Sequence, residues 1–215
     1  MTSARDEVLG RIRGALQDVP TAERPEDVPV AGGYRTRDEL PREELVHRFA
    51  ERVAEYKARV RQVTEAELPQ AIAEAIRARG VWRLVVPADA PDTWLPEFIS
   101  PLRDSGQLTH EELDACDGVL TGCALGVAQT GTIVLDHGAR QGRRAISLLP
   151  DYHLCLVWAH QVVGLVPEAI AALAPAAQER RPLTFISGPS ATSDIELNRV
   201  EGVHGPRTLE VLIVL

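Results

Sequence analysis

Short, wholly apolar runs alternate with helical segments along most of this chain, and this alternation restricts the possible folds more than any other feature of the sequence. The run at 84–86 is typical of a strand buried on both faces, as in a parallel sheet. An amphipathic helix is predicted over 41–60, and a second one over 64–79, from a Thr-x-x-Glu capping box to Gly80. We therefore expect an α/β fold in which a mostly parallel sheet is flanked by helices.

The same patterns outline the domains. Residues 3–17 carry one apolar stripe and are predicted to be helical, and residues 20–33 are rich in proline. Further strands are expected at 60–63, 118–120, 125–128, 131–135, 154–163, 183–187 and 208–215, with helices from 109 and over 167–174. We expect residues 1–58 to form an N-terminal helical extension with a Pro-rich linker, and residues 59–215 to form the α/β domain.

The charge and hydropathy of the chain argue against two classes of binding partner, nucleic acids and membranes. The chain has 31 acidic and 23 basic residues, a net charge of −8, which argues against binding a nucleic-acid backbone. No apolar run approaches the roughly 18 residues of a membrane span, and the N-terminus has no apolar signal-peptide core. We expect a cytoplasmic protein that does not span a membrane.

The number and spacing of the cysteines and histidines indicate whether this chain can bind a metal or an iron–sulfur cluster. None of the three cysteines is in C-x-x-C spacing, so a disulfide framework is not expected. An iron–sulfur cluster normally takes four ligands, one more than this chain's cysteines supply. The histidines have no zinc-type spacing. We therefore expect no metal and no cofactor bound by this chain alone.

Two loops rich in glycine and hydroxyl groups are the strongest candidates for ligand binding. Glycine allows close backbone approach to a ligand, and hydroxyl and free N–H groups bind carboxylate or phosphate. The second loop follows an apolar strand, where ligands sit in open α/β sheets. The candidates are Gln129, Thr130, Gly131, Thr132, Ser187, Gly188, Ser190, Thr192, Asp194 and Glu196. The alternative is that each loop is an ordinary turn, the second one capping a helix.

Nearby charged residues extend this candidate site. Arg143 and Arg144 follow the first loop, together with Arg140, and are suited to hold an anion, although a solvated loop is the alternative. The candidates for a general acid or base are His153, His204 and Asp151, which a structural hydrogen bond would explain equally well. The chain lacks the phosphate-loop, dinucleotide-binding and nucleophile-elbow motifs, so ATPase, dehydrogenase and serine-hydrolase functions have no support.

Four motifs in this order resemble one known family. They are Ala-Gln-Thr-Gly-Thr-Ile-Val-Leu at 128–135, Arg-Arg and Ser-Leu-Leu-Pro within 143–150, Ser-Gly-Pro-Ser-Ala-Thr-Ser-Asp-Ile-Glu at 187–196 and Gly-Val-His-Gly-Pro-Arg at 202–207. About residues 40–215 resemble the lactate-utilisation (LUD) domain family, and most closely its protein C branch (LutC-like, YkgG-like). The resemblance implies a fold like that of ribose-5-phosphate isomerase, glucosamine-6-phosphate deaminase and CoA-transferases.

The resemblance also implies a function. It suggests a subunit that acts with iron–sulfur partner proteins in oxidising L-lactate to pyruvate, with the clusters on the partners. The family commonly has Glu-Thr-Gly-Thr where this chain has Gln129 in first place. An amide orients a ligand by hydrogen bonds but does not act as a carboxylate nucleophile, so covalent chemistry of the CoA-transferase kind is not expected.

Three functions therefore stand at this point. The first is a lactate-oxidation subunit that binds a small anionic metabolite. The second is a stand-alone, isomerase-like enzyme acting on a small phosphorylated or carboxylated metabolite, which rests on analogy of fold alone. The third is a structural or regulatory module, for which the helix at 41–60 and the Pro-rich arm would supply the docking surface unless they cover this chain's own sheet.

Overall fold

The computed structural model describes residues 3–20, 22, 24, 27, 32–188 and 205–215. The chain divides into two compact units, Met1–Arg35 and Thr36–Leu215. The boundary expected at residue 58 is therefore moved to residue 35. The reason is that the helix before residue 58 buries its apolar face within the second unit, as described below.

In the N-terminal unit, the structure describes the α-helix α1 (Ala4–Ala15). Its first turn is closed by a capping box in which Ser3 and Asp6 bond reciprocally. No residue of α1 is buried, and its apolar stripe of Val8, Ile12 and Leu16 is exposed. The helix expected at 3–17 is thus present.

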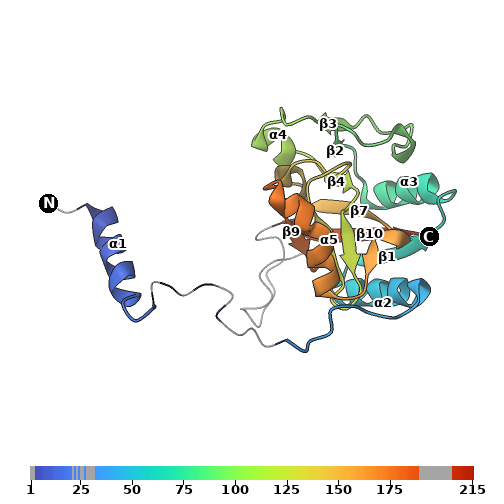
Figure 1. Ribbon diagram of the computed structural model, residues 1–215. Helices are drawn as coiled ribbons and strands as arrows, with labels where there is room; N and C mark the ends of the chain where they lie inside the picture. The colour runs from blue at the N-terminus through green and yellow to red at the C-terminus, as the bar shows by residue number, and fades with distance from the viewer. Residues whose placement is uncertain (1–2, 21, 23, 25–26, 28–31, 189–204) are drawn as a thin grey trace. The chain divides into compact units, whose positions relative to one another are not determined.

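A six-stranded sheet in which every neighbouring pair is parallel forms the centre of the second unit (Figure 1). In spatial order its strands are β1 (Arg59–Val63), β10 (Thr208–Val214), β7 (Tyr152–Trp158), β4 (Gly118–Thr121), β2 (Leu84–Pro87) and β3 (Leu102–Asp104). The expected α/β class with a mostly parallel sheet is confirmed.

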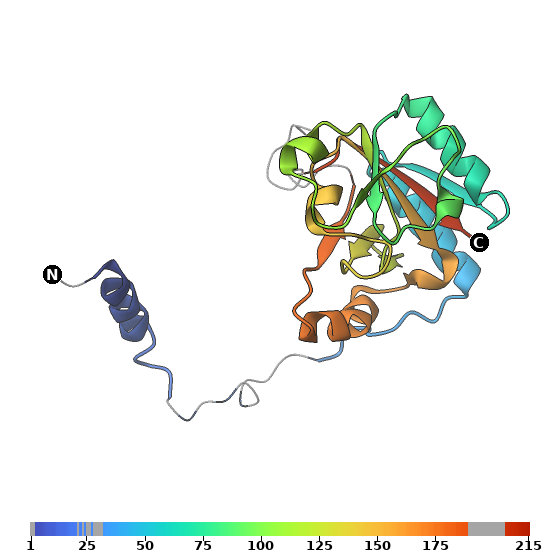
Figure 2. The same ribbon diagram turned by 90° about the horizontal axis from the view of Figure 1, so that it is seen from above.

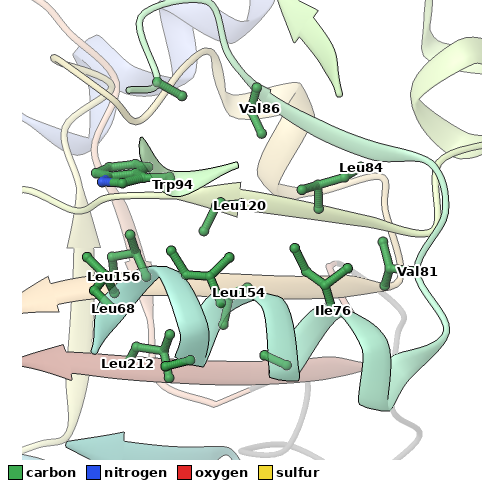
Figure 3. Packing of buried hydrophobic residues seen from close by; sticks show 14 of the residues in the cluster. Leu68, Ile76, Val81, Leu84, Val86, Trp94, Leu120, Leu154, Leu156 and Leu212 are labelled. Atoms are coloured by element: carbon green, nitrogen blue, oxygen red, sulfur yellow. The ribbon is translucent and has the colours of Figure 1, made fainter. Parts of the chain in front are cut away.

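Helices cover both faces of this sheet. On one face α3 (Leu68–Arg79) packs Ile72 and Ile76 against buried leucines of β2, β4, β7 and β10 (Figure 3). On the other face α2 (Arg42–Glu55) packs Phe49 and Val53 against alternate residues of β7 and β10. Because α2 covers this chain's own sheet, its apolar face is not available for docking another chain.

A smaller, four-stranded sheet continues from the carboxyl ends of the large one. Its order is β8 (Val162–Val163), β5 (Leu125–Val127), β6 (Thr132–Leu135) and β9 (Thr184–Ile186). One face packs against α2, where Gly126 is needed because a Cβ on it would lie 2.8 Å from the Phe49 ring. The other face is covered by α5 (Val166–Gln178), which lies across the unit from α3 when seen from above (Figure 2).

Three predicted elements differ clearly from the structure. The helix expected over 64–79 begins at Leu68, because residues 65–67 form a turn and Glu67 is the N-cap, without a side-chain cap hydrogen bond. The helix expected over 41–60 ends at Glu55, because Lys57 has a positive φ of 64° and the next residues enter β1. The strand expected over 154–163 is interrupted after Trp158 by a 3-10 turn, η4 (Ala159–Gln161), so its last residues join the smaller sheet as β8. This interruption turns the chain across the carboxyl edge of the large sheet.

The remaining elements connect these layers. They are α4 (His110–Asp114) and the 3-10 turns η2 (Asp92–Trp94) and η3 (Arg144–Ser147). Within the described part of the chain, no helix is both long enough and apolar enough to cross a membrane.

Candidate functional site

The two predicted loops do come together. Because β6 and β9 pair antiparallel, the start of β6 lies opposite the residue that follows β9. The Thr132 hydroxyl oxygen lies 2.8 Å from that of Ser187 and 2.7 Å from that of Thr130, within hydrogen-bond distance of both. The hydroxyl cluster, as we name Thr130, Thr132 and Ser187, thus joins the two loops that the sequence separates by more than fifty residues.

The glycines of these loops pack against α2. A Cβ on Gly131 would lie 2.6 Å from the carbonyl carbon of Arg52, and one on Gly188 would lie 2.7 Å from the Cβ of Tyr56. Both contacts are at the carboxyl end of α2, where the helix dipole is negative and disfavours an anion. The three hydroxyls also bond to one another. The hydroxyl cluster therefore acts as a packing joint between the smaller sheet and α2.

The other predicted residues of the loops are only partly placed. Gln129 has an exposed side chain, and its backbone N–H donates to the Gly164 carbonyl oxygen at 3.0 Å. Five candidates lie outside the described residues, namely Ser190, Thr192, Asp194, Glu196 and His204. Their roles, and the role of Gln129 in binding, remain predictions.

The two predicted arginines lie away from the hydroxyl cluster. Arg143 forms a two-point ion pair with Asp104, with distances of 2.8 and 3.1 Å, and also donates to the Leu108 carbonyl oxygen. The Asp104 carboxylate raises the pKa of this guanidinium. Arg144 begins η3 and is exposed. The Arg143 fork is thus occupied by a buried carboxylate of this chain.

The predicted acid–base residues are also separated. His153 is 1% exposed inside β7, and its Nε2 lies 2.8 Å from the Thr121 hydroxyl. Asp151 is exposed at the amino end of β7 and lies 3.3 Å from the exposed Arg207. In a parallel sheet this is the edge opposite the usual ligand site. The arrangement gives no support to an isomerase that uses this pair.

A pocket of about 770 Å³ lies at the carboxyl edge of the large sheet. It is bordered by Gly122 and Cys123, just after β4, and by Trp158, the last residue of β7. The loop after β6, which carries Arg140, and the segment after β2, which carries Trp94, also border it, as do η4 and α5. Its volume lies within the usual range for small-molecule sites, and its place is where open α/β sheets bind ligands. We call it the carboxyl-edge pocket.

Arg140 is the feature of this pocket that most suggests a ligand. Its guanidinium carbon lies 6.0 Å from the centroid of the Trp158 ring, and its side chain is exposed. Among the described residues, no carboxylate is within ion-pair distance of this guanidinium. Of the two acids that border the pocket, Asp136 is paired with Arg181 at 2.9 Å and Glu65 is exposed. An anion entering the pocket would therefore meet an available cation.

The backbone of Arg140 is held in an unusual conformation. Its φ is 61°, which costs a residue with a side chain about 1 kcal/mol or more. Its N–H donates to Asp89 at 2.7 Å, and its carbonyl oxygen accepts from the N–H of Gly122 at 2.8 Å. These two bonds fix the residue between the ends of β2 and β4. Backbone strain that the surroundings enforce is typical of functional positions.

The loop that carries Arg140 is anchored at both sides. The Asp136 carboxylate accepts from the Gln141 amide at 2.7 Å and pairs with Arg181. His137 lies within hydrogen-bond distance of two partners, the Gly142 carbonyl oxygen at 2.8 Å and the Thr184 hydroxyl at 2.9 Å. The loop is therefore preorganised, which lowers the entropy cost of binding.

Sequence reasoning missed this pocket as a site, although it noticed one of its residues. Arg140 stood out as part of an arginine-rich loop, but nothing in the sequence distinguishes it from Arg143, which the fold pairs internally. The tryptophans Trp94 and Trp158, whose ring centroids are 5.7 Å apart, carried no motif. Within the described ranges, no group of three or more His, Cys, Asp or Glu side chains is arranged to hold a metal ion.

Comparison with known proteins places this chain among relatives. Residues 46–214 match the family model of the LUD domain. The chain is 49% identical to lactate utilization protein C of Deinococcus radiodurans over 98% of its own length and 95% of the relative's. It is 41% identical to the uncharacterized protein YkgG of Escherichia coli over 41% of this chain and 40% of that protein. A crystal structure of a DUF162 family protein from Deinococcus radiodurans has a TM-score of 0.71 and 46% identity, covering 82% of this chain and 99% of that one.

Proposed function

Since this chain belongs to the LUD domain family, we propose that it is a subunit of a system that oxidises L-lactate to pyruvate. Support comes from the relative named lactate utilization protein C, which is 49% identical over nearly the whole chain. At that level of identity and coverage, the same fold and a related role are the simplest expectation. In this system, the partner proteins would carry out the redox step itself.

We propose further that the carboxyl-edge pocket holds the carboxylate of a small anionic metabolite. The observation that carries this step is Arg140, which has no carboxylate partner among the residues that the structure describes and is fixed at the ends of β2 and β4 beside Trp158. A guanidinium matches a carboxylate in geometry and binds it by charge-assisted hydrogen bonds. The hydroxyl cluster offers no comparable charge in the part of the chain that the structure describes.

The redox centres are assigned to iron–sulfur partner proteins. This chain has three cysteines, and an iron–sulfur cluster normally takes four. Two of them, Cys123 and Cys155, lie together, whereas Cys116 is in a different part of the core. Three cysteines in two separate parts of the core do not supply the four ligands of a cluster. We therefore propose that this chain binds the metabolite and that its partners carry the electrons.

Calorimetry with L-lactate and pyruvate tests the pocket. We expect Arg140→Gln to weaken binding about tenfold to a hundredfold, because a hydrogen bond to a charged group contributes about 1.5–3 kcal/mol. The matched control is Arg180→Gln, since Arg180 is also exposed, has a φ of 59° and does not border the pocket. Equal affinities of the two variants, or no binding of either acid by the unaltered protein, would overturn this part of the proposal.

Co-purification tests the partners. We expect the tagged chain, co-expressed with candidate Cys-rich iron–sulfur proteins from the same organism, to retain them through size-exclusion chromatography. Lactate-dependent reduction of an electron acceptor should then require all of the components together. Full lactate oxidation by the iron–sulfur proteins without this chain would show that it is not a functional subunit.

A further inference from the structure

Two of the three cysteines form a buried pair behind the wall of the carboxyl-edge pocket. Thr121 of β4 is the direct neighbour of Cys155 in β7, and Cys123 follows Thr121 by two residues. The Cys155 sulfur lies 3.9 Å from the carbonyl oxygen of Gly122, the residue before Cys123. Both residues belong to the same buried cluster of the core.

Polar groups around Cys155 favour its thiolate. The Cys123 thiol and then His153 lower the pKa of the Cys155 thiol, against the effect of burial, and Thr121 adds to this. The same pairing, together with burial, raises the pKa of Cys123. Of the two sulfurs, Cys155 is therefore the better nucleophile, and thiol–disulfide chemistry begins with attack by a thiolate.

The pair has a route to solvent through the pocket. Cys123 borders the pocket and is 4% exposed, whereas Cys155, in the same cluster of the core, is fully buried. The Cys123 carbonyl oxygen accepts from the Gln161 amide at 2.8 Å, and the carbonyl oxygen of the same Gln161 side chain accepts from the backbone N–H of Trp158 at 2.9 Å. Any movement of Cys123 is therefore transmitted to the Trp158 side of the pocket.

We propose that Cys123 and Cys155 are a reversible modification site at which hydrogen peroxide forms an intramolecular disulfide in the pocket wall. The Cys155 sulfur attacks the O–O bond, giving a sulfenic acid and hydroxide. The Cys123 sulfur then displaces the hydroxyl group of the sulfenic acid, and the thiol proton leaves with it as water. Overall two thiols are oxidised by two electrons and one peroxide is reduced to two waters.

The disulfide changes the pocket. Before oxidation the Cys123 thiol donates to the Gln161 carbonyl oxygen at 3.6 Å. Bonding to Cys155 removes this contact and draws the residue toward β7. The Gln161 side chain also accepts a hydrogen bond from the backbone N–H of Trp158. We therefore expect the environment of the Trp158 indole to change with the oxidation state of the cysteines. The site thereby couples the redox state of the surroundings to the shape of the proposed ligand pocket.

Cys116 provides an internal control. It lies in a separate part of the core beside α4, and its thiol donates to the Glu112 carbonyl oxygen at 3.1 Å. Burial raises the pKa of this thiol. In the described structure it has no neighbouring cysteine, and burial outweighs the effect of Arg83, which favours its thiolate, so it is not expected to be oxidised under the same conditions.

Thiol mapping of the full-length protein tests the proposal. The reduced protein is treated with hydrogen peroxide, unfolded in N-ethylmaleimide, digested and analysed by mass spectrometry. We expect a peptide pair linked through Cys123 and Cys155, full alkylation of Cys116, and recovery of all thiols after dithiothreitol. Cys116→Ser should form the same link, whereas Cys123→Ser and Cys155→Ser should form none.

If Cys123→Ser or Cys155→Ser does not fold, the unaltered protein and Cys116→Ser still decide whether the disulfide forms. Three alkylated thiols after peroxide, or oxidation to sulfinic acid without a cross-link, would overturn the proposal. Tryptophan fluorescence of the oxidised protein should shift and return with dithiothreitol. The assay uses no lactate or pyruvate, so a failure here leaves the proposed function untouched, and a failure of lactate binding leaves this result standing.

Discussion

Replacing Gly131 by alanine tests the claim that the two loops are a packing joint. Gly131 has a φ of 62°, and an added Cβ would lie 2.6 Å from the carbonyl carbon of Arg52 and 2.7 Å from the backbone nitrogen of Val53. Both neighbours are backbone atoms of α2, so neither can rotate away. The substitution therefore forces the smaller sheet and α2 apart.

The magnitude follows from two contributions. A left-handed backbone conformation costs a residue with a Cβ about 1–2 kcal/mol. Overpacking against atoms that cannot move adds about 1–3 kcal/mol. Gly80→Ala isolates the first contribution, because Gly80 has a φ of 66° and its Cβ would have nothing within 4 Å.

Urea unfolding of both variants measures the difference. We expect Gly131→Ala to lower the free energy of unfolding by about 2–5 kcal/mol and Gly80→Ala by about 1–2 kcal/mol. If the two variants lose the same stability, the loop does not press on α2 and this reasoning is refuted. Full stability with lost lactate binding would instead favour the loops as the ligand site.

Three further predictions address other parts of the structure. Arg143→Met should lower the free energy of unfolding by about 1–3 kcal/mol, since it leaves the buried Asp104 carboxylate unpaired, and adding Asp104→Asn should restore part of it in urea melts. The backbone N–H and hydroxyl of Thr64 lower the pKa of Glu67 from 4.5, so their bonds stabilise the fold above that pH and the effect is lost as pH falls. Thr64→Val should therefore flatten the fall of stability below about pH 4.5 in acid titrations followed by circular dichroism. A chain lacking residues 1–35 should keep its thermal midpoint, because the second unit contains every buried cluster, and a fall of several degrees would contradict this.

Much of the fold could be predicted because its signals are local. The apolar run at 84–86 predicted a buried strand, which is present. The predicted bonds between Thr64 and Glu67 also form, although α3 itself begins only at Leu68. The strand expected over 154–163 was wrong after Trp158, since η4 contains no glycine or proline to mark it. That turn carries the chain into the smaller sheet, and only non-local pairing with β5 reveals it.

The candidate site was less predictable for the same reason. The meeting of Thr132 with Ser187 was expected as two loops at one place, and the structure brings them together. Whether a particular arginine is free depends on which carboxylate the fold places beside it. Arg143 meets the buried Asp104, whereas Arg140, three residues earlier, meets the Trp158 ring. The spacing of these arginines in the sequence does not indicate which of them has a carboxylate partner in the fold.

The position of His153 illustrates a related limit. Its place near the start of an apolar strand was compatible with an acid or base and equally with a structural hydrogen bond, and the structure shows a hydrogen-bond contact with Thr121. In the structure it sits opposite Val119 in the middle of a parallel sheet and is covered on both sides. Burial of this kind depends on the neighbours in the sheet, which a single sequence does not specify.

A crystal structure of the protein soaked with pyruvate tests the central claim most directly. The account predicts electron density for the acid in the carboxyl-edge pocket, with its carboxylate within hydrogen-bond distance of the Arg140 guanidinium and beside Trp158. Density at the hydroxyl cluster of Thr130, Thr132 and Ser187, with an empty carboxyl-edge pocket, would contradict it.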